Sequence, residues 1–147
     1  MTTHLEPTWE AGRAFLARAT AGEIVMLNLL RLRAVADYSA DPSLAPAAGP
    51  ISGAEAYDRY IAHALPHLRR SGGDLQFLGA GGPFLIGPTG ERWDRVTLVR
   101  QRSVETFMAF AADVGYCAGL GHRTAALEDS RLLPLVPLPL PDVSAIH

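Results

Sequence analysis

The chain has 147 residues, a formal net charge of −2, 48% hydrophobic residues and 19% charged residues. This length fits one domain, and the composition is that of a packed core rather than a disordered chain. All thirteen basic residues are arginine, which excludes chemistry that needs a lysine amine, such as Schiff-base, pyridoxal-phosphate or phosphate-loop sites. With a net negative charge, nucleic acid is not an expected partner.

The cysteine content and the N-terminal sequence indicate the cellular compartment. A single cysteine, Cys117, can form neither an internal disulfide nor a metal-binding cysteine pair, which favours a reducing cytoplasm. Residues 1–7 carry no basic patch before an apolar run, and no apolar stretch approaches the ~18 residues of a membrane span. We therefore expect a single cytoplasmic domain over residues 1–147 with no membrane partner.

The first third of the chain predicts a helix, a strand and a long loop. Residues 8–20 repeat apolar side chains at helical spacing after Thr8, a typical N-cap residue. Residues 24–32 are almost continuously apolar, as in a central strand buried on both faces. Residues 34–52 contain several prolines without periodicity, so this segment is either a lid over a site or a plain surface loop.

A second helix is predicted from Ser52, with Glu55 at the capping-box position, to the glycines at 72–73. Its apolar stripe includes Tyr57. Pro66 removes one backbone hydrogen bond inside this helix, so we expect a kink or a join between two turns there.

Two strands should follow. Residues 75–78 form one, and residues 84–86 either extend it beyond a glycine-rich bulge or form a separate strand. Residues 93–101 form the next, with Trp93 on one face and Asp94 on the other.

The last part predicts a broken helix, a strand and a tail. Ser103 caps a helix, a second helical segment runs from residue 116 to about 127, and residues 131–136 form the final strand. The prolines that alternate with leucine and valine after residue 134 predict an extended tail at 137–147.

After the leading helix, the order strand, helix, strand, strand, helix, strand is that of the ferredoxin-like α+β fold, βαββαβ. This fold places an antiparallel sheet under helices that cover one face. Because the predicted strands are apolar on both faces, a monomer would expose an apolar patch that soluble monomers rarely tolerate. We expect a homodimer in which two such sheets pack face to face.

Four segments together resemble the uncharacterised family called domain of unknown function 1330: residues 25–33, 53–60, 82–87 and 122–131. The resemblance spans residues 24–136. It implies a dimeric α/β barrel of the ferredoxin-like superfamily, whose other branches include antibiotic-biosynthesis monooxygenases, haem-degrading enzymes, polyketide cyclases and muconolactone isomerases. The leading helix, the 34–52 loop and the tail look like additions to that barrel.

Four residues are candidates for binding or catalysis inside the barrel. Asn28 is the polar residue within an apolar strand, and it either orients a ligand or makes a structural hydrogen bond. His122 can exchange a proton near neutral pH, and Arg123 beside it can hold a carboxylate or enolate. Asp94 is a candidate base or orienting carboxylate. In the structural alternative, Arg123 forms an ion pair with Asp94 or with one of the acidic residues at 128–129.

Tyr60, His63 and His67 lie along one flank of the second helix, and Tyr60 is a candidate ligand contact. A histidine pair four residues apart can bind metal, but Ala64 stands where a zinc protease carries its glutamate, and no third ligand is evident. We expect no metal site and assign the two histidines to a surface or an interface.

Three functions remain open. The first is an isomerase- or monooxygenase-like enzyme without a cofactor, acting on a small oxygen-rich or aromatic anion, with His122 as acid–base and Arg123 as clamp. The second is haem binding or degradation, since Asn28, Trp93 and His122 repeat residue types of haem-degrading relatives. The third is a non-catalytic binding or structural dimer.

Overall fold

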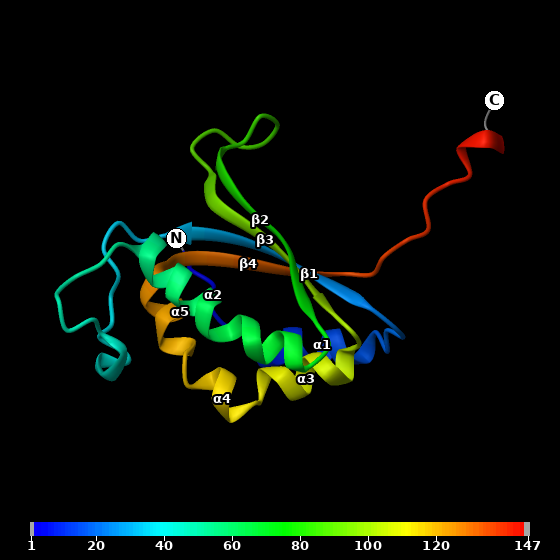
Figure 1. The fold of residues 1–147 in the computed structure, drawn as a ribbon. Helices are drawn as coiled ribbons and strands as arrows, with labels where there is room; N and C mark the ends of the chain where they lie inside the picture. The colour runs from blue at the N-terminus through cyan, green and yellow to red at the C-terminus, as the bar shows by residue number, and fades with distance from the viewer. Residues whose placement is uncertain (1, 146–147) are drawn as a thin grey trace.

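The computed structural model describes residues 2–145, and Figure 1 shows a curved sheet lying above a layer of helices. In chain order the elements are α1 (Trp9–Ala17), β1 (Ile24–Leu32), the 3₁₀ turn η1 (Pro42–Leu44), α2 (Gly53–Arg70), β2 (Asp74–Pro83), β3 (Arg92–Gln101), α3 (Val104–Ala111), α4 (Val114–Cys117), α5 (Leu120–Ala126), β4 (Leu127–Leu135) and the turn η2 (Val143–Ala145). No helix within residues 2–145 is long and apolar enough to cross a membrane.

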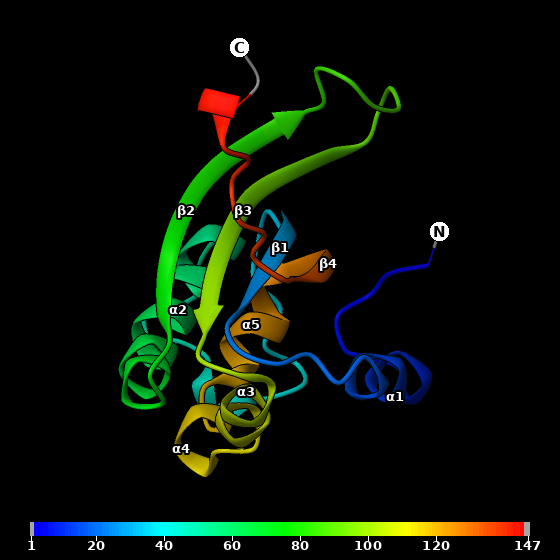
Figure 2. The ribbon, with the colours of Figure 1, turned by 90° about the vertical axis from the view of Figure 1, so that its right-hand side faces the viewer.

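The sheet has the strand order β2-β3-β1-β4, with every neighbouring pair antiparallel. This is the ferredoxin-like arrangement that the order of elements predicts, with β3 and β1 as the two central strands. Figure 2 shows α2, α3, α4 and α5 together on one side of the sheet, while α1 lies near the edge of that layer. The sheet therefore has a covered face and an open face.

β1 is apolar on both of its faces, but the side chains on the two faces have different surroundings. Ile24, Met26 and Leu30 are buried on the covered face, where Leu30 packs against Tyr57 of α2 and Leu127. The alternate residues of β1 point to the open face and are only half-buried. The covered face is the main core of the chain.

The β2–β3 hairpin differs from the sequence prediction. β2 runs through the glycines as far as Pro83, and residues 84–86 belong to the turn rather than to a strand. The irregularity in pairing lies between Leu75 and Phe77, before the glycine-rich stretch. Residues 79–83 remain extended because β3 pairs with them over their whole length, which overrides the low strand propensity of glycine.

The last strand is longer than predicted. β4 starts at Leu127, four residues before the predicted start at 131, because pairing with β1 begins at that residue. The preceding helical segment is split in two, and Asp113 caps α4 by accepting a hydrogen bond from the Tyr116 amide at 2.8 Å. Pro134 is accommodated since β4 is an edge strand.

α2 begins where predicted: the Ser52 hydroxyl accepts a hydrogen bond from the Glu55 amide at 3.0 Å. It runs through Pro66 as one helix and is not joined from two pieces. Its buried side chains lie on both sides of Pro66, so packing on the sheet holds the helix together across the missing hydrogen bond.

The open face carries an apolar row that crosses all four strands. Cross-strand pairing aligns Phe77 of β2, Leu98 of β3, Leu27 of β1 and Leu133 of β4. Phe77 is 52% exposed and Leu133 is 55% exposed. No element within residues 2–145 covers this row, as Figures 1 and 2 show.

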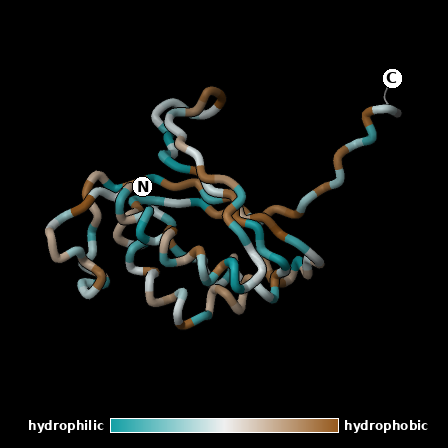
Figure 3. The backbone as a smooth tube through the Cα atoms, viewed as in Figure 1, coloured by the Kyte–Doolittle hydropathy of each residue, from teal (hydrophilic) through white to brown (hydrophobic). Residues whose placement is uncertain are grey.

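Two segments project on the open side. The end of the β2–β3 hairpin extends beyond the sheet, and its tip, residues 84–86, is hydrophobic (Figure 3). Leu85 at this tip is fully exposed. The chain after β4 also leaves the domain in an extended form, with Leu138 and Leu140 exposed. We call these two segments the arm tip and the tail.

Asp129 of β4 anchors the N-terminal segment. Its carboxylate accepts hydrogen bonds from the backbone amides of His4 at 2.7 Å and Ser130 at 2.9 Å, and it pairs with Arg131 at 2.9 Å. Arg31 lies 3.9 Å from the Asp129 carboxylate, and the guanidinium groups of Arg31 and Arg131 both lie over the ring of Trp93. Burial alone would raise the pKa of Asp129, but these hydrogen bonds outweigh it and lower the pKa.

Candidate functional site

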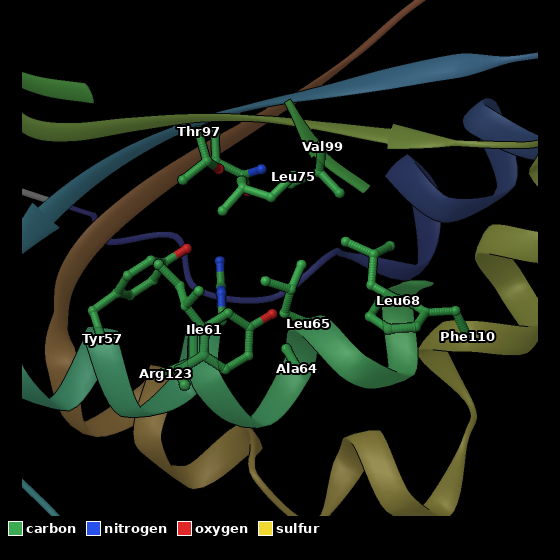
Figure 4. Close-up of a pocket in the computed structure, with 12 residues that line it drawn as sticks. Tyr57, Ile61, Ala64, Leu65, Leu68, Leu75, Thr97, Val99, Phe110 and Arg123 are labelled. Carbon is green, nitrogen blue, oxygen red and sulfur yellow. The ribbon is translucent and has the colours of Figure 1, made fainter. Parts of the chain in front are cut away.

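A cavity of about 80 Å³ lies between α2 and the covered face of the sheet (Figure 4). Its polar lining comes from Asn28, Tyr57, Tyr60, Thr97 and Arg123. Its apolar lining includes Ile61, Leu65, Leu68, Leu75, Val99 and Phe110. Three of the residues singled out from sequence, Asn28, Tyr60 and Arg123, thus meet around one space.

Asn28 reaches the cavity because it is an even-numbered residue of β1, on the covered face. Thr97 lies directly opposite it on β3 and lines the same wall. The Asn28 residue is 8% exposed, and its side chain lines the cavity, where no side-chain hydrogen bond joins its amide to another residue in 2–145. A buried amide normally has partners, so this one is available to a ligand or to water.

Arg123 enters the cavity from α5, and Figure 4 shows its guanidinium standing in the gap beside Leu65. Nη1 donates to the carbonyl oxygen of Leu5 at 2.8 Å, and Nη2 approaches the Ser130 hydroxyl at 3.4 Å. No carboxylate of residues 2–145 forms an ion pair with Arg123. The positive charge is held in place without a negative partner.

The phenols near the cavity are neutral. Burial raises the pKa of Tyr57 and of Tyr60, so both hydroxyls keep their protons at neutral pH. The Tyr60 and Tyr116 hydroxyls are 2.7 Å apart and form a hydrogen bond. Figure 4 shows the Tyr57 hydroxyl directed toward Thr97 across the gap. These groups supply hydrogen bonds but no charge that would neutralise Arg123.

His122 does not line the cavity. Its Nδ1 is 2.7 Å from the Tyr38 hydroxyl, and the two rings meet edge to face. Tyr38 belongs to the 34–52 segment, which lies along α5 through a hydrogen bond from the Asp37 amide to the carbonyl of Ala125. Burial lowers the pKa of His122, and the nearby Arg59 adds to that shift. His122 and Arg123 therefore face different spaces.

Asp94 is also outside the cavity. Its carboxylate accepts a hydrogen bond from the Leu32 amide at 2.8 Å and pairs with Arg92 at 3.3 Å. The β1–β3 pairing ends at Leu30, so the Asp94 carboxylate takes the place of a strand carbonyl as the acceptor for the Leu32 amide. The structure does not bring Asp94 together with His122 or Arg123.

The histidine pair packs between helices. His63 hydrogen-bonds the carbonyl of Gly115 at 2.7 Å, and its ring lies where a side chain at Gly119 would have to be. His67 lies 3.4 Å from Asp113. No cluster of three or more metal-ligating residues occurs within 2–145. The two histidines hold α2 against α4 and α5 within one chain.

Sequence reasoning missed two polar residues of the cavity. Tyr57 was assigned to the apolar stripe of the second helix, and Thr97 was not singled out within the predicted strand at 93–101, yet both line the space. The signal that could have identified Thr97 is its position opposite Asn28, which follows from the β1–β3 register. That register depends on tertiary pairing and cannot be read from either strand alone.

The chain is similar to several proteins of known structure. The RPA0582 protein of unknown function from Rhodopseudomonas palustris is 39% identical, with a TM-score of 0.82, and the match covers 95% of this chain and 100% of that one. A second crystal structure, of the methylated RPA0582 protein, is 40% identical with the same TM-score and covers 95% and 98% of the two chains.

A dimeric ferredoxin-like protein of unknown function from Thermobifida fusca is 15% identical, with a TM-score of 0.46, over 80% of this chain and 93% of that one. No protein-family model matches the chain, so the resemblance to domain of unknown function 1330 gains no support from that comparison. No curated protein matches it either.

Proposed function

Because this chain belongs to the family of the RPA0582 protein of Rhodopseudomonas palustris, itself of unknown function, we propose its function from its own cavity: it binds a small organic anion between α2 and the sheet. The observation that carries this proposal is the pairing of an unneutralised guanidinium, Arg123, with an unpartnered buried amide, Asn28, in one cavity. Buried charges and amides are costly without partners, and an anion would satisfy both.

In this proposal each polar residue has a distinct task. Arg123 binds the anion, Asn28 orients it, and Tyr60 and Tyr57 complete the polar wall as neutral hydroxyls. The acid–base role suggested for His122 would belong to a different place, beside Tyr38, because His122 is outside the cavity lining. Anion binding at Arg123 is thus better supported than proton transfer by His122 in this cavity.

The haem alternative has less support. The cavity of about 80 Å³ is small beside the ~300–1,000 Å³ of ordinary ligand pockets. Its lining offers tyrosine but no histidine, methionine or cysteine as an axial ligand of haem iron, and burial keeps both tyrosines, Tyr57 and Tyr60, protonated. Haem binding would require the helices to move away from the sheet.

The proposal includes a homodimer formed through the open face. The apolar row from Phe77 to Leu133 lies uncovered, and the arm tip and the tail extend on the same side. A second copy offers an identical apolar face, and two-fold packing would cover both at once. Light scattering should then return about twice the chain mass of 15.7 kDa. A particle of 15.7 kDa at micromolar concentration would contradict the dimer.

A thermal-shift screen with organic anions and neutral small molecules tests the binding function. Ala64 lines the cavity from α2, and Ala64→Leu would fill part of it without changing charge. Ala62→Leu, on the exposed side of the same helix, is the matched control. At least one anion should stabilise the parent and Ala62→Leu but not Ala64→Leu. Equal stabilisation of all three proteins would overturn the proposed site.

A further inference from the structure

The cavity has two chemically different parts. Asn28 and Thr97 form a polar end on the sheet, with Tyr57 and Arg123 facing them from the helices. The remaining wall is mainly apolar, and its side chains come from α2, β2, β3 and α3. A matching ligand has one polar head and an apolar body, since sites of this kind use few polar groups to fix orientation.

The head is negatively charged. A guanidinium has five N–H donors, and Arg123 directs two of its nitrogens to the Leu5 carbonyl and the Ser130 hydroxyl. Other N–H groups of Arg123 remain free to donate, and a carboxylate can accept two parallel hydrogen bonds from a guanidinium. Tyr57 and Tyr60 stay protonated beside Arg123, so neither can serve as the counter-charge. One negative charge balances the site.

The body is small. A cavity of about 80 Å³ is well below the ~300–1,000 Å³ of ordinary ligand pockets, so it has room for a short chain rather than a sugar, nucleotide or polycyclic ring. The apolar part is bounded by Leu65 of α2, Leu75 of β2 and Val99 of β3. Branched aliphatic side chains on three sides suit an aliphatic end.

We infer, resting on the proposed function, that the ligand is a short-chain aliphatic monocarboxylate. Its carboxylate binds the Arg123 guanidinium and the Asn28 amide, and its alkyl end lies among Leu65, Leu75 and Val99. This assignment makes the cavity selective for acids over neutral analogues, and for four- or five-carbon chains over acetate.

Isothermal titration calorimetry of the full chain tests the ligand class with acetate, butyrate, isovalerate and isovaleramide. Isovaleramide has the shape of isovalerate without its charge. Affinity should rise about fourfold for each buried methylene, and isovaleramide should bind at least about tenfold more weakly than isovalerate. Equal affinity for acetate and isovalerate, or for isovalerate and its amide, would overturn the assignment.

Two variants test the head group. Arg123→Gln should weaken isovalerate binding by about tenfold or more, while Arg95→Gln, which removes a surface pair with Asp58, should leave it unchanged. Asn28→Asp places a negative charge in the cavity and should reduce isovalerate binding more than isovaleramide binding. If Arg123→Gln does not fold, the Asn28→Asp comparison decides, and equal losses for the two ligands would refute the carboxylate assignment.

Ala64→Leu separates failure of the ligand class from failure of the proposed function. If this variant loses isovaleramide and isovalerate binding alike, and the parent binds both equally, the cavity is the site and the carboxylate class is wrong. If isovalerate binds Ala64→Leu as tightly as the parent, binding occurs elsewhere and the proposed function fails as well. The result expected is loss of isovalerate binding in Ala64→Leu and its retention in Ala62→Leu.

Discussion

The two faces of β1 resemble each other in sequence and differ in the folded chain. Met26 and Leu30 are buried beneath the helices, whereas Leu27 and Leu29 point to a face that no element in residues 2–145 covers. The covered face includes a polar interruption, Asn28, which lines the cavity. The open face has an uninterrupted apolar row. One face is suited to holding a ligand and the other to holding a second copy.

Hydrophobicity alone therefore does not identify a core. A residue such as Leu29 contributes little to the stability of one isolated chain while it stays half-exposed, but it contributes to association when a partner covers it. Substitutions on opposite faces of the same strand should therefore change different measurements.

The largest effect on stability is expected on the covered face. Leu30 is fully buried, so Leu30→Ala should lower the free energy of unfolding by roughly 2–5 kcal/mol through lost burial and a new cavity. Urea denaturation at fixed protein concentration measures this change. Val35→Ala, at an exposed loop position, should change it by no more than about 0.5 kcal/mol. If Leu30→Ala lowers the free energy of unfolding by less than about 1 kcal/mol, the covered face is not the main core.

On the open face, Leu29→Glu should act on association. A glutamate there would face Arg131 across the β1–β4 pairing, but Arg131 already pairs with Asp129. Burying the added charge between two packed sheets should still be costly, so the dimer dissociation constant should rise about tenfold or more. Analytical ultracentrifugation measures this, and circular dichroism should show the fold retained. Val35→Glu is the charge-matched control. An unchanged dimer carrying Leu29→Glu would mean that the open face is not the interface.

At the edge of the sheet, Asp129→Asn should remove the anchor of the N-terminal segment. We expect a loss of roughly 1–3 kcal/mol at pH 7, because Arg131 loses its counter-charge and hydrogen bonds to the carboxylate weaken. The folded pKa of Asp129 is lowered, so its stabilisation is present above the unfolded value of about 3.9 and disappears as the pH falls through the folded pKa.

Urea denaturation of the parent and Asp129→Asn at pH 7 and pH 3 measures both effects. The gap in unfolding free energy between the two proteins should narrow at pH 3. A gap that is the same at both pH values would show that the charge of Asp129 contributes nothing.

The smallest changes in unfolding free energy are expected at two helix N-caps, which can be compared with each other. The Ser103 hydroxyl caps α3, which packs on the covered face through Val104, so Ser103→Ala should cost about 1 kcal/mol. Thr8 caps α1 in the same way, but α1 buries no residue. Thr8→Ala should therefore fray α1 and change global unfolding by only a few tenths of a kcal/mol. Equal losses would mean that α1 is part of the cooperative core.

The order of elements and the position of β1 could be predicted because helices and strands impose different periods on apolar residues. The start of β4 could not, since Leu127 continues a helical pattern and only pairing with β1 makes it a strand. The glycines of β2 likewise read as a bulge and are extended because β3 pairs with them.

The site was predictable in part for a similar reason. Asn28, Tyr60 and Arg123 are polar residues within or beside apolar patterns, and all three line the cavity. His122 was grouped with Arg123 because the two are neighbours in sequence. Successive residues of a helix point roughly 100° apart, so one enters the cavity while the other meets Tyr38.

We propose that the covered face holds an anion while the open face holds a second copy. A crystal structure of the protein grown with isovalerate tests it most directly. The account predicts ligand density with its carboxylate about 2.7–3.2 Å from the Arg123 guanidinium and the Asn28 amide, its alkyl end beside Leu75, and a two-fold partner on the open face. A cavity closed by side chains, or isovalerate bound only on the open face, would contradict it.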